Sequence, residues 1–191
     1  MLFRYGDKKA GWWDGLIGDG KAIDTTKYFV ICTNVIGSCF GSTGPMSGMY
    51  PSEEPYRLKF PVVTVKDMIR AQMQLLSSLG IFHLKAIIGG SMGGMQALQF
   101  AVDYPNLADD IIALAATYAT RPWTIAFNKV AIEAIRKDPR YKNGNYDKNA
   151  FKKEGLDGLA IGRIAGHISY LSPASMDEKF GRNYVSNDGL F

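Results

Sequence analysis

Residues 84–98 read LKAIIGGSMGGMQAL, which is a short apolar run, a serine set among glycines, and then a helix-like pattern. A strand, a sharp turn and a helix in this order form the context in which Gly89-Gly90-Ser91-Met92-Gly93 matches the nucleophile-elbow pattern G-x-S-x-G. Glycine tolerates a positive φ and a close approach of two backbones. The stretch therefore predicts that the hydroxyl of Ser91 stands exposed on a strained turn.

The elbow pattern assigns candidate roles to the residues around the turn. Ser91 is the candidate nucleophile, and the N–H of Met92, at the start of the helix, is a candidate donor to an oxyanion. The elbow glycines are Gly89, Gly90, Gly93 and Gly94. Two alternatives stay open at this point, since so short a pattern arises by chance and glycine-rich turns of this kind also bind phosphates.

A second glycine-rich stretch offers a competing interpretation of the chain, as a nucleotide-binding protein. Residues 15–22 read GLIGDGKA, one residue short of a P-loop. A P-loop requires Ser or Thr after the lysine and a strand before the first glycine. Ala22 follows Lys21, and AGWWD precedes Gly15, so the nucleotide-binding interpretation is weak.

The chain before Arg121 alternates strand-like and helix-like segments. We expect parallel strands near 28–35, 84–89 and 110–117, because each is a nearly continuous apolar run. A helix should begin after Thr64 as N-cap, end at Gly80 and carry one apolar face made of Met68, Ala71, Leu75 and Leu79. A second helix is predicted over 93–103, before Pro105. This order is typical of an α/β protein with a parallel sheet.

Beyond Arg121 the pattern becomes helical throughout. One predicted helix ends before Pro139, and the next has Gly158, Gly162 and Gly166 at four-residue spacing. Glycines inside a helix are unfavourable, so we expect this stripe to let another helix pack very close. The predicted division is a partial core over 1–121, a helical lid over 122–182 and a C-terminal tail over 183–191.

Composition narrows the class of protein. The chain has 191 residues, 47% hydrophobic and 21% charged, with a formal net charge of +4. Its lysines are scattered, so no nucleic-acid patch is predicted. No apolar run is long enough for a membrane helix, which makes the cytoplasm the expected compartment. Two cysteines and two histidines are too few for a zinc site, and Cys32 is expected to be buried.

Five stretches together resemble one enzyme family. They read GWWDGLIGDGKAIDTTKYFVICTNVIG, GSTGP, FPVVTVKDM, IGGSMGGMQAL and GRIAGHISYLS, and they extend from Gly11 to about Arg182. This combination resembles the homoserine O-acetyltransferases of methionine biosynthesis, which belong to the α/β-hydrolase superfamily. The resemblance implies an α/β-hydrolase fold with a helical lid. It also implies transfer of acetyl from acetyl-CoA, through an acyl-serine, to L-homoserine, with no other bound cofactor.

The resemblance also implies site residues and an assembly. Ser91 matches the nucleophile, Arg163 the arginine that binds the homoserine carboxylate, and Tyr170 a tyrosine of the same pocket. Positions 163 and 170 share a helical face, and a guanidinium suits a carboxylate. We expect both side chains to face Ser91 across a cleft. Members of the family form homodimers through the lid helices.

The match is incomplete where the reaction needs a base. In this superfamily the Asp and His of the triad follow the serine in sequence. His83 precedes Ser91, and His167 lies inside a predicted lid helix, so neither is assigned as the base. We therefore expect the chain to be inactive alone and to associate with itself or with a complementary fragment. Alternatives are a homoserine or serine O-succinyltransferase and a non-catalytic oligomerising remnant.

Overall fold

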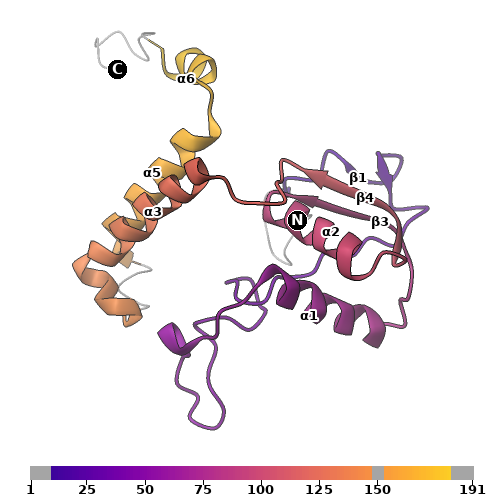
Figure 1. Ribbon diagram of the computed structural model, residues 1–191, viewed down its shortest axis with the longest axis horizontal. Coiled ribbons are helices and arrows are strands. Elements are labelled where there is room, and N and C mark those ends of the chain that lie inside the picture. The colour runs from indigo at the N-terminus through magenta and orange to yellow at the C-terminus, as the bar shows by residue number, and fades with distance from the viewer. Residues whose placement is uncertain (1–9, 148–152, 182–191) are drawn as a thin grey trace.

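Two parallel strands joined by a helix form the centre of the structure, a computed structural model that describes residues 10–147 and 153–181 (Figure 1). Strand β3 (Leu84–Gly90) pairs with β4 (Ala108–Leu114), and Gly90 lies opposite Leu114. Helix α2 (Met92–Asp103) leaves the carboxyl end of β3 and returns the chain to the start of β4. This crossover is the predicted unit, although β4 begins and ends a few residues earlier than expected.

A small apolar core lies between this unit and helix α1 (Val65–Ser78). Its buried members are Ile69, Leu76, Phe100 and Leu107, and Ile31, Met73, Ile81, Leu84, Ile87 and Tyr104 pack around them. The predicted face of α1 is correct in part, because Met68 and Ala71 are partly buried while Leu75 and Leu79 are 41% and 54% exposed. The helix is rotated so that Ile69 and Leu76, seven residues apart, face α2 instead.

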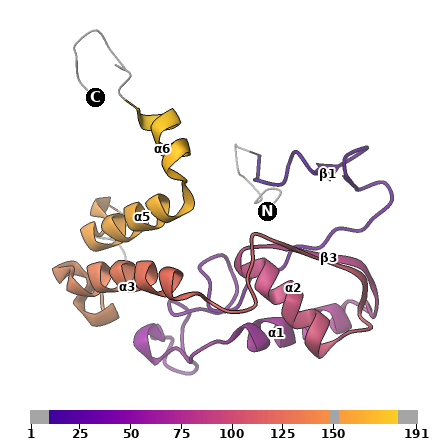
Figure 2. The same cartoon turned by 45° about the horizontal axis from the view of Figure 1, so that its top comes forward.

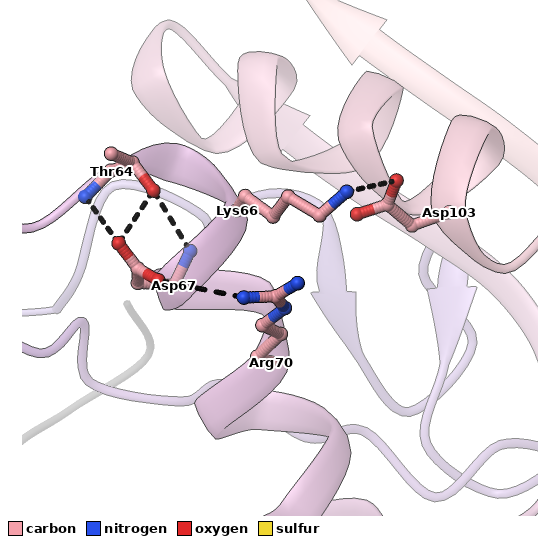
Figure 3. Close-up of polar contacts among 5 residues, drawn as sticks. All are labelled: Thr64, Lys66, Asp67, Arg70 and Asp103. Carbon is pink, nitrogen blue, oxygen red and sulfur yellow. Dashed lines mark hydrogen bonds and ion pairs between the residues drawn. The ribbon is translucent and has the colours of Figure 1, made fainter.

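The start of α1 is closed by a capping box, as Figure 3 shows. Asp67 N–H donates to Thr64 Oγ1 at 3.2 Å, and Thr64 N–H donates to Asp67 Oδ2 at 2.9 Å. The Thr64 hydroxyl also donates to Asp67 Oδ2 at 2.6 Å, which holds the pKa of Asp67 below its ordinary value of 3.8. In the same turn, Lys66 reaches Asp103 of α2 at 3.2 Å and ties the two helices together.

Replacing Thr64 with alanine is expected to lower the free energy of unfolding by about 1 kcal/mol, since Asp67 loses its side-chain partner and α1 loses its cap. Because the folded pKa of Asp67 is depressed, its contact stabilises the fold above the unfolded pKa and is lost as pH falls through the folded value. Urea denaturation at pH 7 and at about pH 3 measures both effects. Ser77→Ala, an exposed change in the same helix, is the control; an equal loss in both variants would contradict the cap.

The segment before α1 departs from the prediction. Residues 28–35 form no strand, so the strand expected there is wrong. Only two-residue strands precede it, β1 (Ile17–Gly18) and β2 (Ile23–Asp24), which pair in parallel with each other. Ile31 packs against the core, but Phe29 is 85% exposed, and Cys32 is exposed rather than buried. An apolar run becomes a buried strand only where other strands pair with it, and no described strand pairs with residues 28–35.

A pair of helices follows the core unit and lies beyond the carboxyl ends of β3 and β4 (Figures 1 and 2). Helices α3 (Pro122–Lys137) and α5 (Asp157–Tyr170) pack on each other and are connected through the 3₁₀ segment η2 (Pro139–Gly144). Helix α6 (Pro173–Phe180) ends the described chain, and η1 (Arg57–Lys59) contacts η2. The division at 121/122 stays a prediction, and the tail 183–191 lies outside the described residues.

The glycine stripe of α5 does bring the two helices close. A Cβ on Gly158 would lie 2.2 Å from the carbonyl oxygen of Ala134, and one on Gly162 would lie 3.3 Å from the Cβ of Ala131. Since 158 pairs with 134 and 162 with 131, the helices are antiparallel. Gly166 has no atom of the described structure within 4 Å of such a Cβ, so the prediction is confirmed for two of the three glycines.

The closed end of this pair is held by a buried carboxylate. Asp138 is 7% exposed, and its Oδ2 accepts a hydrogen bond from the N–H of Gly158 at 2.9 Å. Its other oxygen accepts from the backbone N–H of Arg140 at 2.9 Å, and these two donors hold the pKa of Asp138 below its ordinary value. Arg140 in turn pairs with Asp157 at 2.8 Å. The first turn of α5 is thereby capped from the end of α3.

Alanine at Gly158 and at Gly166 should have opposite effects. Gly158→Ala forces Cβ against a backbone carbonyl, and overpacking of this kind destabilises by roughly 1–3 kcal/mol. Gly166→Ala meets open space and should stabilise by up to about 1 kcal/mol through helix propensity. Thermal unfolding followed by circular dichroism, with hydrogen exchange of α3 amides, measures both. A stabilising Gly158→Ala would show that α3 and α5 are not in close contact.

Candidate active site

Ser91 stands between β3 and α2 in the conformation that its glycine neighbours suggest. Its φ is 54° and its ψ is −119°, and its side chain is exposed. A positive φ is rare for a residue with a Cβ and stores strain of order 1–3 kcal/mol. Its N–H donates to the carbonyl oxygen of Leu114 at 2.9 Å, so the β3–β4 ladder extends into the turn. Strand pairing thus holds the residue in its strained conformation.

The four elbow glycines divide into two kinds. A Cβ on Gly89 would lie 2.1 Å from the carbonyl oxygen of Gly93, and one on Gly94 would lie 2.5 Å from the Cβ of Ala116. A side chain at Gly89 or Gly94 would therefore require β3, α2 or the segment after β4 to move. At Gly90 and Gly93 nothing in the described structure lies within 4 Å of the same point. Close approach of β3 and α2 therefore depends on Gly89 and Gly94.

The first turn of α2 offers unpaired donors beside Ser91. The first N–H groups of a helix have no partner within it, and their dipoles place partial positive charge at that end. The Met92 N–H donates to no other described residue, whereas the Met95 N–H bonds to the carbonyl oxygen of Ser91 at 3.1 Å. An oxyanion formed on a substrate at Ser91 could accept from Met92. This arrangement is suited to acyl transfer.

Neither histidine lies beside Ser91. His83 precedes β3 at its amino end and Ser91 follows its carboxyl end, so the length of the strand, roughly 20 Å by strand rise, separates them. There its Nε2 lies 2.9 Å from Asp109 Oδ1, while Lys85 lies 3.2 Å from Oδ2. Lys85 and then His83 hold the pKa of Asp109 below its ordinary value. His167 is exposed on α5, which packs on α3 and on no element of the strand unit.

Arg163 and Tyr170 both lie on α5 with exposed side chains. Arg163 forms no ion pair with another described residue. Tyr170 lines a hollow of about 210 Å³ between α3 and α5. The other residues that line it are Trp123, Thr124, Phe127, Asn128, Ala131, Gly162, Gly166 and Ser169. Neither Ser91 nor Arg163 is among them, so the expected cleft joining the three residues stays a prediction.

Two features of the elbow were not predicted. Ala115, just after β4, has a φ of 47° and turns the chain away beside the elbow. Gln96, in the second turn of α2, is 6% exposed and bonds to Gln72 of α1. A glutamine on the buried face of a helix is a signal that sequence can show, because a buried amide requires partners. The turn at Ala115 leaves no such signal, since alanine rarely adopts a positive φ.

Within residues 10–147 and 153–181, no group of three or more His, Cys, Asp or Glu side chains is placed to hold a metal ion. No helix in these ranges is both long and apolar enough to cross a membrane.

Comparison with known proteins places this geometry in a family. Residues 8–159 match the family model described as alpha/beta hydrolase fold. The chain is 66% identical over 187 residues to a homoserine O-acetyltransferase of Nautilia profundicola, covering 97% of this chain and 51% of that protein. The resemblance inferred from the sequence is confirmed. The chain thus spans about half the length of the curated relatives it matches.

Solved structures agree on the fold. A crystal structure of homoserine O-acetyltransferase from Bacillus anthracis superposes with a TM-score of 0.83 at 36% identity, covering 96% of this chain and 50% of that one. Esterase E22 superposes with a TM-score of 0.82 at 34% identity, covering 97% and 52%. The predicted α/β-hydrolase fold is therefore confirmed.

Proposed function

Because the chain belongs to the alpha/beta hydrolase fold family, we propose that it provides the nucleophile of an acetyltransferase that acetylates L-homoserine. The observation that supports this most directly is the geometry of Ser91, exposed at a positive φ between a parallel strand and a helix N-terminus. The 66% identity to a homoserine O-acetyltransferase supports the choice of substrates.

The proposed reaction has two steps at Ser91. In the first, Oγ attacks the thioester carbonyl of acetyl-CoA, a base takes the hydroxyl proton, and the C–S bond breaks as the base gives that proton to sulfur, which releases the CoA thiol. In the second, the base takes the proton of the homoserine side-chain hydroxyl as its oxygen attacks the acyl-serine, the bond between the acyl carbon and Oγ breaks, and Oγ receives that proton. The Met92 N–H donates to the carbonyl oxygen while it is negatively charged in each tetrahedral intermediate. Acetyl-CoA is a substrate here, and no resident cofactor is proposed.

We place the binding site for the acceptor, homoserine, on α5. The guanidinium of Arg163 is exposed and forms no ion pair within the described residues, so it is available to a carboxylate in a bidentate manner. We propose that it binds the homoserine carboxylate and that Tyr170 lines the same pocket. A cytoplasmic location and a homodimer built through α3 and α5 belong to the same proposal. Both helices expose large apolar side chains, among them Trp123 at 72% and Ile164 at 60%.

The base is to be sought outside the described residues. His83 lies at the end of β3 that is far from Ser91. His167 lies on α5, and α5 contacts α3 but neither the strands β3 and β4 nor the helices α1 and α2. We propose that a polypeptide segment carrying the Asp and His of the triad completes the site. The chain by itself should then show only the residual rate that a site without its base retains.

Hydrolysis is the second candidate function. Esterase E22 superposes with this chain as well as the acetyltransferase of known structure does. An esterase would use the same acyl-serine and differ only in the acceptor, with water in place of homoserine. The 66% identity to an acetyltransferase favours transfer over hydrolysis.

The test measures release of free thiol from acetyl-CoA together with formation of O-acetylhomoserine. It compares the chain alone with the chain mixed with the half of a relative that follows the matched region. We expect product only in the mixture, dependent on homoserine. Succinyl-CoA and serine replace donor and acceptor in parallel reactions, and they decide between the acetyl and succinyl alternatives.

Other outcomes separate the remaining hypotheses. Thiol release that continues without homoserine beyond one equivalent per Ser91 would identify hydrolysis, with water as the acceptor. Full turnover by the chain alone would contradict the assignment of the base to another segment. No turnover in any mixture, together with a stable dimer in analytical ultracentrifugation, would favour the non-catalytic oligomerising remnant.

A further inference from the structure

A pair of glutamines lies behind the elbow, between α1 and α2. Gln96 is 6% exposed, and its Oε1 accepts a hydrogen bond from Gln72 Nε2 at 2.6 Å. Its Nε2 donates to the carbonyl oxygen of Met92 at 3.3 Å. The neighbouring contacts between these helices are apolar, with Ile69 and Phe100 in the same core. A buried amide is unfavourable unless it is paired, so this position is suited to glutamine only because both partners are present.

The contacts also determine how the two amides face. A backbone carbonyl only accepts hydrogen bonds, so the group that Gln96 presents to Met92 must be its NH₂. The carbonyl oxygen of Gln96 must then face Gln72, which has to supply its own NH₂. One fixed acceptor at the elbow thus sets the orientation of both side chains. The pair forms a directed chain from α1 to the first residue of α2.

This chain ends next to the strained serine. A positive φ at a residue with a Cβ persists only where the surroundings hold it. On the strand side, the N–H of Ser91 is held by Leu114. On the helix side, the peptide that follows Met92 is held by Gln96, and through Gln72 it is anchored to α1. The peptide between Ser91 and Met92, which carries the Met92 N–H, lies between these two held groups.

We propose that Gln96 is a positioning residue for acyl transfer at Ser91 and that Gln72 orients it. Gln96 touches neither substrate nor the reacting atoms. It acts through the Met92 carbonyl, by fixing the turn that presents the nucleophile and the oxyanion donor. The kinetic part of this inference rests on the proposed function, and the structural part does not.

Hydrogen exchange tests the structural part in the full chain. Gln96→Met keeps the side-chain length and removes the donor to Met92, and Gln72→Met leaves Gln96 without its donor. We expect amide exchange over residues 91–96 to rise about threefold to tenfold in both variants, with exchange in α3 and α5 unchanged. Gln74→Met, an exposed change on α1, is the matched control. Unchanged exchange over 91–96 in both variants would overturn the proposal.

Serine reactivity tests the kinetic part, in the chain mixed with the polypeptide that supplies the base. Labelling of Ser91 by a fluorophosphonate should slow about tenfold in Gln96→Met, while KM for acetyl-CoA stays within about twofold. In Gln96→Glu a carboxylate faces the Met92 carbonyl. The labelling rate of this variant, divided by that of the parent, should rise as pH falls, because the protonated carboxyl can donate to that carbonyl. A ratio that does not change with pH would overturn the positioning role. If the parent itself is labelled no faster than Ser91→Ala, the proposed function fails instead, and exchange still decides the structural inference.

Discussion

Replacing Ser91 with alanine should abolish acetyl transfer in the mixture of this chain with the segment that supplies the base, a loss on the order of 10⁶-fold in kcat. Alanine retains the Cβ and so the backbone contacts of the turn, but it removes the atom that becomes acylated. Relief of the positive φ at Ser91 is not expected, since alanine has the same preference, so folding should be unchanged. Thiol release from acetyl-CoA and the mass of the acyl-enzyme measure the effect.

The matched control is a substitution of His83, the histidine beside β3. His83 lies at the amino end of β3 in contact with Asp109, so His83→Gln should leave turnover within about twofold. It should also remove the partner that, after Lys85, lowers the pKa of Asp109. Loss of activity in His83→Gln equal to that in Ser91→Ala would identify His83 as the base and contradict the geometry of β3. Turnover that survives in Ser91→Ala would remove the acyl-serine altogether.

The elbow could be predicted from the sequence because its determinants are local. Gly89, Ser91 and Gly94 lie within six residues, and their conformation follows from which residues tolerate a positive φ or a close contact. The N-cap at Thr64 was predictable for the same reason, since a capping box spans only four residues. Features of this kind need no knowledge of distant segments.

The conformation of residues 28–35 could not be predicted from the sequence, because a segment forms a strand only when another strand pairs with it. The run YFVICTNV has the apolar composition of a buried strand, yet Phe29 and Cys32 are exposed and the segment joins no sheet among the described residues. Composition records the environment for which a segment is suited, while pairing depends on which other strands lie beside it. The partial burial of Ile31 against the core is the part of that prediction that the structure retains.

The inner face of a helix was only partly predictable. In α1, the pattern placed Leu75 and Leu79 inward, and the structure buries Ile69 and Leu76. The apolar residues of α1 form one broad face, and Leu75 and Leu79 lie toward its edge, so the predicted stripe was displaced from the centre of that face. In α5, glycine decides the rotation, because only Gly158 and Gly162 admit the backbone of α3. The relation of Arg163 to Ser91 depends on how the lid and the strand unit meet, which no local pattern specifies.

Alanine at Gly89 should both destabilise the fold and reduce the reactivity of Ser91. The added Cβ would lie 2.1 Å from the carbonyl oxygen of Gly93 and 2.7 Å from the nitrogen of Gly94, both backbone atoms of the first turn of α2. No rotamer change relieves such a contact, so the helix must move away from β3. We expect the free energy of unfolding to fall by about 3 kcal/mol and acylation of Ser91 to slow by roughly 10²-fold, the effect of misplacing a reacting group by about 1 Å.

Gly90 provides the matched control for this prediction, because it is the next residue of the same strand and its Cβ would meet no atom of the described structure within 4 Å. Gly90→Ala should unfold at the same denaturant concentration as the parent, or at a slightly higher one, since alanine restricts the unfolded chain. Urea denaturation and the rate of fluorophosphonate labelling at Ser91 measure both variants. If Gly89→Ala and Gly90→Ala behave alike, the close contact of β3 with the first turn of α2 is not what holds Ser91 in its strained conformation. If only Gly89→Ala is slow and unstable, the approach of these two backbones positions the nucleophile.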